Sequence, residues 1–191
     1  MPGPCPDRPV LPGGLARATP VSPGTRKPCP RDVPNSRLRG RAGRSLTRIS
    51  WSHAELGEYQ LALTCGNDAL GLHQNLANLD GQASTWHGMG FAHYRLGQYA
   101  QALTCYHHAL ILLQDLGNRF YEAQVLVGLG DTHHGHGNLD AAGDAWRQAL
   151  IIFDDLHHAR AAAVRTRLRT LAPPTLTPSA RAESASPGQV E

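Results

Sequence analysis

The sequence has little lysine and no long apolar segment. Lys27 is the only lysine among the 18 basic residues of the 191-residue chain. No stretch approaches the roughly 20 consecutive apolar residues that a membrane-spanning helix needs. The N-terminal region also lacks the apolar run of a signal peptide. We therefore expect a soluble, intracellular protein that resides in the cytoplasm and has no membrane partner.

Cysteine is scarce and is not arranged in close pairs. The chain has four cysteines and no CxxC motif. Cys5 and Cys29 lie in a proline-rich N-terminal arm, whereas Cys65 and Cys105 occupy equivalent places in an internal repeat. This spacing argues against a disulfide framework and against a cysteine-based structural zinc site. Reduced thiols are expected in an intracellular chain.

Motifs of nucleotide-binding and hydrolytic sites are also missing. The chain contains no GxSxG, HExxH, Walker-type or GxGxxG motif. The stretch GLGDTHHGHG at residues 128–137 is rich in glycine, but its glycines fall at repeat positions rather than in a strand-to-helix loop. The nucleotide-binding and hydrolase interpretations therefore have no support in the sequence.

Charge and proline are concentrated at the ends of the chain. Residues 1–44 carry a net charge of +7 and ten of the 14 prolines, residues 45–156 carry −7, and the remainder carries +3. Such an N-terminal stretch has too few apolar side chains to offset the entropy of ordering it. We predict a disordered Pro/Arg-rich arm at residues 1–42 and a disordered tail at residues 173–191.

An internal repeat is the strongest feature of the sequence. LGEYQLALTCGNDAL at residues 56–70 returns as LGQYAQALTCYHHAL at 96–110, with nine of 15 positions identical, and HGNLDAAGDAWRQAL at 136–150 follows at the same spacing of 40. An apolar stretch with spacings of three, four and seven precedes each copy. Each unit therefore predicts a helix, a short turn and a second helix, and such units must stack to bury their apolar stripes.

The predicted helix ends follow from the same pattern. The second helix of the middle unit runs from about Tyr99 to Leu116, and Gly117 supplies the left-handed residue that ends it. A last helix at residues 159–171 is predicted to cap the exposed end of the stack, and Pro173 with Pro174 stops it.

These repeats resemble the tetratricopeptide repeat family. The family signature places Trp, Leu-Gly, Tyr, Ala, Phe and a later Ala at set intervals. The first unit is degraded, because Ser50 replaces the glycine and Gly66 replaces the aromatic residue; its Leu46, Ile49 and His53 fit. His93 and His133 replace the usual tyrosine, and packing is expected to explain them. The matching structural positions of the other two units are Trp86, Met89, Gly90, Ala102, Tyr106, Ala109, Leu126, Leu129, Gly130, Ala142, Trp146 and Ala149.

The resemblance implies a fold and a domain organisation. It implies an all-α, right-handed superhelix at residues 43–172, with units at about 43–82, 83–122 and 123–158 and the capping helix. Three repeats are close to the minimum for an independent stack, so marginal stability is expected. Removing Trp86 is predicted to lower the free energy of unfolding by roughly 3 to 5 kcal/mol if its side chain is fully buried.

The 40-residue period resembles a longer variety of these repeats. That variety occurs at the C-terminal end of large actinobacterial regulators, in which a nucleotide-switch (NB-ARC) module precedes the repeats. The resemblance implies a scaffold or sensor part of a transcriptional or signalling regulator. It implies no catalytic residues, no metal and no cofactor.

Function is expected in the concave groove that such a stack forms. Exposed aromatic residues beside charged ones suit a peptide anchor site. A protein or peptide ligand, or another domain of a regulator, is the expected partner. The alternative is that Trp51, Phe91 and Tyr94 are buried against neighbouring helices. The predicted groove residues are Trp51, His87, Phe91, Tyr94, Arg95, Gln124, Val127, Asp131 and His134.

Three other interpretations stay open at the level of sequence. Asp131, His133, His134 and His136 could form a metal site, and a histidine-dependent metalloenzyme would follow from it. Cys105 has a histidine three residues further on, so a thiol nucleophile competes with a buried thiol. The basic arm could contact DNA phosphates, whereas the acidic repeats would repel nucleic acid.

Overall fold

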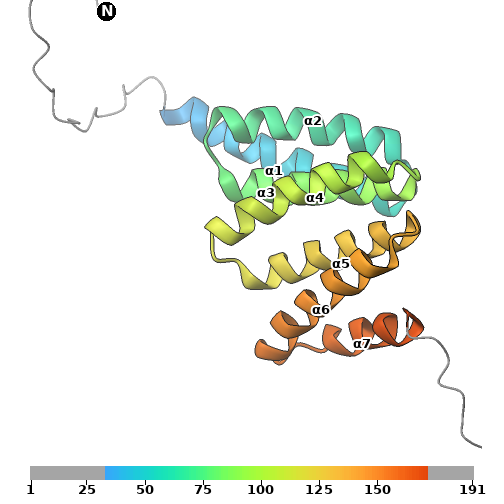
Figure 1. Cartoon of the computed structure of the whole chain (residues 1–191). Helices are drawn as coiled ribbons and strands as arrows, with labels where there is room; N and C mark the ends of the chain where they lie inside the picture. The colour runs from blue at the N-terminus through green and yellow to red at the C-terminus, as the bar shows by residue number, and fades with distance from the viewer. Residues whose placement is uncertain (1–32, 172–191) are drawn as a thin grey trace, which may run out of the picture.

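The computed structural model describes residues 33–171, and this part of the chain forms seven helices and no strand. Figure 1 shows α1 and α2 together at one end of the stack, α3 to α6 after them, and α7 at the opposite end. The predicted all-α fold of three helix pairs and a capping helix is confirmed. No helix within the described range is long and apolar enough to cross a membrane. The helices are α1 Val33–Glu55, α2 Tyr59–Asn75, α3 Leu79–Arg95, α4 Tyr99–Asp115, α5 Arg119–Gly135, α6 Leu139–Asp155 and α7 Arg160–Leu171.

The first helix of each of the three units begins earlier than the sequence predicts. Helix α1 starts at Val33, so the arm cannot extend to residue 42 as predicted. The proline at position 34 is tolerated in a first helical turn, and the arginines that follow are good helix formers. Helices α3 and α5 start four residues before the predicted unit boundaries at 83 and 123. The predicted boundaries mark the first strongly apolar positions of the repeat, which lie one turn inside α3 and α5. The rest of the predicted arm (residues 1–32) and the predicted tail lie outside the described residues.

The same turn joins every pair of consecutive helices. A residue with positive φ follows each helix at a spacing of 20 residues. Its N–H donates to the carbonyl three residues back, and the next N–H donates to the carbonyl five residues back. These two bonds are those of a Schellman motif. The six left-handed residues are Gly57, Ala77, Gly97, Gly117, Gly137 and His157.

We expect a substitution at Gly117 and one at Ala77 to have opposite effects on stability. Gly117→Ala should lower the free energy of unfolding by about 1 kcal/mol, because φ is +66° and nothing lies within 4 Å of an added Cβ. Ala77→Gly should raise it by about 0.5 kcal/mol, because Ala77 already has φ of +50°. Urea denaturation measures both, and two changes of the same sign would contradict the assignment.

Two large aromatic side chains pack on glycines of neighbouring helices. Tyr106, 2% exposed, lies against Gly90 of α3 and Gly128 of α5, where a Cβ atom would overlap its ring. Trp146, 3% exposed, lies against Gly130 in the same way. The remaining predicted repeat positions are buried, with one exception: Trp86 is only partly buried and stacks on His108. The premise that Trp86 is fully buried was therefore wrong.

Neighbouring groups compensate for the two positions at which the first unit departs from the repeat signature. Gly66 stands where later units have Tyr106 and Trp146, and Met89 fills the space beside it. A Cβ atom at Gly66 would come within 2.8 Å of Met89 Cγ. Ser50 is buried, and its hydroxyl donates to the Ala62 carbonyl at 2.7 Å. A flexible side chain thus replaces a rigid ring, as methionine commonly does in irregular cores.

A buried histidine network joins the first three helices. His73 is fully buried, at the repeat position of Leu113 and Phe153. Its Nε2 lies 3.1 Å from the hydroxyl of Thr47, and its Nδ1 accepts a hydrogen bond from the Asn78 amide at 3.1 Å. Burial lowers the pKa of His73, so the ring is neutral at pH 7. The sequence analysis did not single out this residue, although its 40-residue spacing from Leu113 and Phe153 marks a core position, because histidine is seldom a core residue.

Candidate functional site

The first helices of the units line a groove of about 360 Å³. Equivalent positions of successive first helices face the same side, because the stacking repeats every 40 residues. His87, Val127 and Arg167 form one such set on α3, α5 and α7. The groove is therefore a product of stacking and belongs to no single unit.

The structure places most of the predicted groove residues in this lining. Arg95, the last residue of α3, lies outside it, where its guanidinium covers the rings of Tyr59 and Phe91. His134 also lies outside it, because its ring packs on Trp146 with the ring centroids 5.6 Å apart. The predicted residues that do line the groove are Trp51, His87, Phe91, Tyr94, Gln124, Val127 and Asp131.

Aromatic rings form one wall of the groove. Trp51 stacks on Phe91 with the centroids 6.0 Å apart, and its edge meets His87 at 5.1 Å. His87 in turn lies 5.9 Å from the ring of Tyr106. Trp51, His87 and Phe91 are all half-buried, so each ring packs against its neighbours and still faces the groove. These rings are therefore neither fully buried nor fully exposed, and their role in binding a peptide stays a prediction.

His87 is held in its neutral form. Burial lowers its pKa to about 4, and the guanidinium of Arg160 acts in the same direction. The imidazole therefore carries no charge at pH 7. This wall of the groove carries no charge at neutral pH, which suits contact with an apolar side chain.

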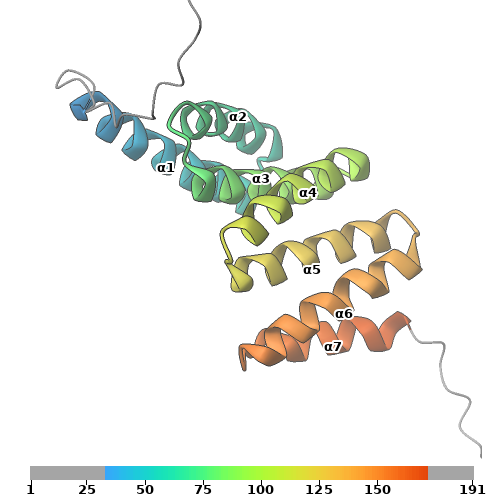
Figure 2. The ribbon, with the colours of Figure 1, turned by 60° about the vertical axis from the view of Figure 1, so that its left-hand side comes forward.

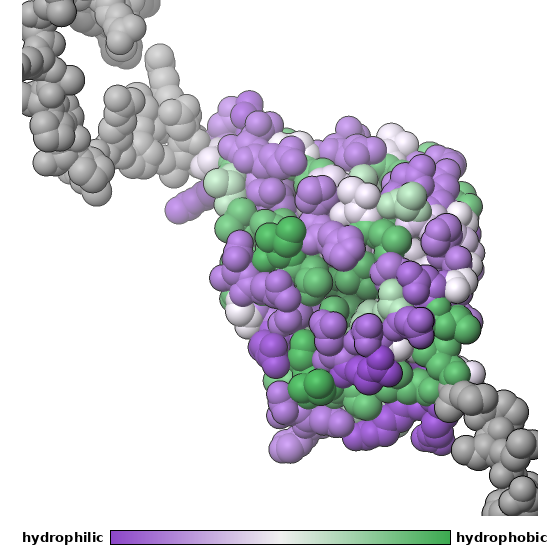
Figure 3. Space-filling model, viewed as in Figure 1, coloured by the Kyte–Doolittle hydropathy of each residue, from purple (hydrophilic) through white to green (hydrophobic). Residues whose placement is uncertain are grey.

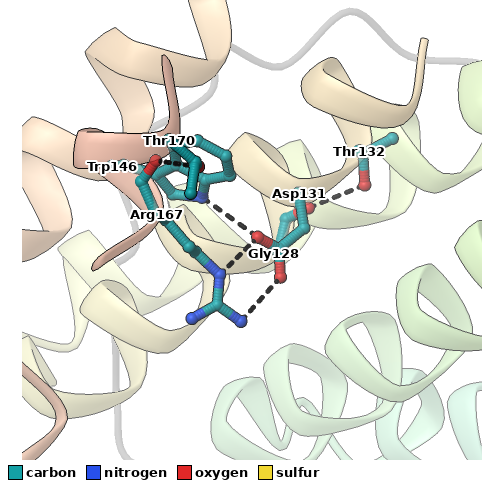
Figure 4. A network of polar contacts seen from close by, with 6 residues as sticks. All are labelled: Gly128, Asp131, Thr132, Trp146, Arg167 and Thr170. Atoms are coloured by element: carbon teal, nitrogen blue, oxygen red, sulfur yellow. Dashed lines mark hydrogen bonds and ion pairs between the residues drawn. The ribbon is translucent and has the colours of Figure 1, made fainter. Parts of the chain in front are cut away.

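Asp131 is the centre of a hydrogen-bond network at the other end of the groove (Figure 4). The indole Nε1 of Trp146 donates to Oδ1 of Asp131 at 3.1 Å. The guanidinium of Arg167 donates from Nε to Oδ1 at 2.8 Å and from Nη2 to Oδ2 at 3.3 Å. A bidentate pair of this kind is both oriented and charge-assisted. It ties α7 to α5, so one predicted groove carboxylate already has a partner within the chain.

The sequence missed the contribution of α7 to the groove. It assigned this helix only a capping role, yet four α7 residues line the groove. The signal was present, because Arg167 follows His87 and Val127 at the 40-residue spacing. The turn before α7 has His157 instead of glycine at its left-handed position, and this substitution and the loss of the family signature concealed it. The lining residues that the sequence missed are Tyr106, Gly128, Phe153, Arg160, Ala163, Val164 and Arg167.

The histidine-rich segment does not assemble a metal site. Within residues 33–171 no three His, Cys, Asp or Glu side chains are placed to hold a metal ion together. Asp131 is bonded to Trp146 and Arg167, and His134 packs on the Trp146 ring. His133 is half-buried, and burial together with His107 and His136 lowers its pKa.

Cys105 is a buried thiol. It is 5% exposed, and burial raises its pKa to about 11. The nearby histidine, His108, stacks on Trp86 with the centroids 4.8 Å apart. A thiol with this pKa is protonated at pH 7, so the arrangement does not support a thiolate nucleophile.

Comparison with known proteins agrees with this architecture. Residues 81–155 match the family model described as tetratricopeptide repeat. The match covers α4, α5 and α6 and nearly all of α3. No curated protein matches the chain. Repeats of this family generally mediate protein–protein interactions. Residues 81–155 therefore form tetratricopeptide repeats, and α1, α2 and α7 extend the same helical stack.

Proposed function

We propose that this protein binds a peptide segment or protein domain in the groove that α1, α3, α5 and α7 line. One observation carries the proposal: the Trp51–Phe91–His87 wall is half-exposed beside a hollow of about 360 Å³. Aromatic side chains with a free face supply contact area at a low entropic cost, and they are enriched among residues that dominate binding energy.

The charges around the groove favour a partner that is partly acidic. Arg160 lines the groove and covers the Phe120 ring, and no ion pair within residues 33–171 involves it. Arg95 is exposed near the aromatic wall. Asp131 is neutralised by Arg167. We infer that the bound segment places an apolar side chain on the wall and a carboxylate near Arg160.

The resemblance to the repeats of large actinobacterial regulators supports a further proposal about role. In such a regulator the groove would serve as a scaffold or sensor surface for a partner domain. The proposed binding is non-catalytic and needs no cofactor.

Selection from a displayed library of random peptides against the full chain tests the groove proposal. We expect enriched peptides to combine aromatic or aliphatic residues with Asp or Glu. Phe91→Ala should weaken the binding of such a peptide about tenfold, because it removes one face of the aromatic wall.

Ile111→Ala is the matched control, since Ile111 is 58% exposed and does not line the groove. Affinity can be measured by fluorescence anisotropy of a labelled peptide. Enriched peptides that bind the Phe91 variant as tightly as the wild type would place the binding surface elsewhere.

A further inference from the structure

A file of four arginines runs along the exposed side of α1. Arg37, Arg41, Arg44 and Arg48 follow one another at spacings of four, three and four residues, which places them on one face of a helix. All four are exposed. With a rise of about 1.5 Å per residue, the file extends over roughly 16 Å. We call these four residues the α1 arginine file.

Within residues 33–171, the α1 arginine file forms no ion pair. Helix α1 contains no acidic residue before Glu55. Several arginines on later helices do form ion pairs, whereas Arg95, Arg160 and Arg169 do not within residues 33–171. Arg119, Arg147 and Arg165 each pair with a carboxylate.

The file does not serve the stability of the fold. Like charges three and four residues apart destabilise a helix, so the arrangement opposes helix formation. Helix α1 has 23 residues where each of the next five has 17, and Figure 2 shows that its N-terminal end projects beyond the rest of the stack. Figure 3 shows hydrophilic residues gathered at this end, beside the grey atoms. Cations held on a projecting helix without partners are available to an external anion.

The shape beside the file suits phosphate groups. A shallow hollow of about 360 Å³ lies between Ser36, Arg37, Gly40, Arg41 and Arg44. Another of about 230 Å³ continues it, lined by Arg41, Arg44, Ser45 and Arg48. Guanidinium groups contact phosphate oxygens through two parallel N–H donors.

We propose that the α1 arginine file binds the phosphate backbone of double-stranded nucleic acid without reading its sequence. The file carries no aromatic side chain for stacking on unpaired bases, which favours a duplex over a single strand. A membrane surface suits it less well, because the adjacent exposed face of α1 has only Leu38 and Ile49 as large apolar residues. The acidic middle of the chain would keep the duplex on this end of the stack.

Fluorescence anisotropy of the full chain with a labelled 24-base-pair DNA duplex of arbitrary sequence tests the proposal. The double variant Arg41→Gln, Arg44→Gln should weaken binding about tenfold at 50 mM salt. It should also reduce the slope of log affinity against log salt by about two, because each lost phosphate contact removes about 0.9. Two duplexes of unrelated sequence should bind equally.

Two charge-matched controls locate the contact. Arg147→Gln with Arg169→Gln removes the same charge from exposed positions on α6 and α7. Arg17→Gln with Arg26→Gln removes it from positions outside the described residues. An affinity loss in either control as large as that of the file variant would overturn the proposal, since net charge or the arm would then explain binding.

Two further probes distinguish phosphate from other anions. Tighter binding to vesicles of three parts phosphatidylcholine to one part phosphatidylserine than to the duplex would overturn the proposal in favour of a membrane surface. Equal affinity for poly-glutamate at the same salt would overturn it in favour of an acidic protein. Tighter binding to the duplex than to both, lost selectively in the file variant, supports it. Because no groove residue is changed, this outcome is independent of peptide binding.

Discussion

Replacing Trp146 by alanine is expected to lower the free energy of unfolding by about 3–5 kcal/mol. The side chain is 3% exposed and lies against Gly130 in the centre of the main core. Its indole N–H also donates to Asp131, which would keep only Arg167 as a partner. A stack of three helix pairs has little stability to spare, so the variant should be largely unfolded at 37 °C.

Trp86→Ala is the matched comparison, because it removes a tryptophan side chain from the middle unit instead of the third. Trp86 is partly exposed and stacks on an exposed histidine, so we expect a loss of only about 1–2 kcal/mol. Urea denaturation followed by circular dichroism measures both variants. An equal loss of unfolding free energy in the two variants would contradict the prediction that the cost of each substitution follows the burial of the tryptophan.

Acid is expected to destabilise the protein through His87. The sign follows from linkage: the pKa of this histidine is about 4 in the folded chain and about 6.5 when unfolded. Between these values the unfolded chain binds a proton that the folded chain excludes, so stability falls as pH drops from 6.5 to 4. The contribution of His87 between pH 7.5 and pH 5 is about 2 kcal/mol.

Comparison of the wild type with His87→Leu isolates this contribution. We expect the loss of stability from pH 7.5 to pH 5 to be about 2 kcal/mol smaller in the variant. Effects of the substitution that do not depend on pH cancel, because the stability of each protein at pH 5 is compared with its own stability at pH 7.5. His73 and His133 also have lowered pKa values, so the variant should retain part of the acid sensitivity. An identical pH dependence in the two proteins would refute the assignment.

The repeat explains why so much of the fold could be predicted. Each unit repeats the same turn and the same small residues, so three copies of one pattern predicted six of the seven helices and the helix end at Gly117. Seven of the nine predicted groove residues line the groove for the same reason, since a helix face repeats with the unit. The regulator role and the identity of the partner stay proposals.

The residues that were wrongly placed are those whose environment is set by a neighbouring helix. Trp86 occupies a signature position but stacks on exposed His108 of α4, and His134 packs on Trp146 of α6 instead of facing the groove. Period alone gives the face of a helix that a side chain occupies. It does not give the size of the residue that meets it from the next helix.

The sequence by itself determined the helix pairs, their turns and the face that each helix buries, because these depend on local spacing and on residues such as glycine. Only the tertiary structure decided which polar groups are satisfied within the chain. It pairs Asp131 with Arg167, which lies 36 residues away on a helix that the sequence assigned only a capping role. It also leaves the α1 arginine file without a partner among the described residues. Charge pairing depends on the distances between side chains on different helices, and those distances are set only when the helices pack together.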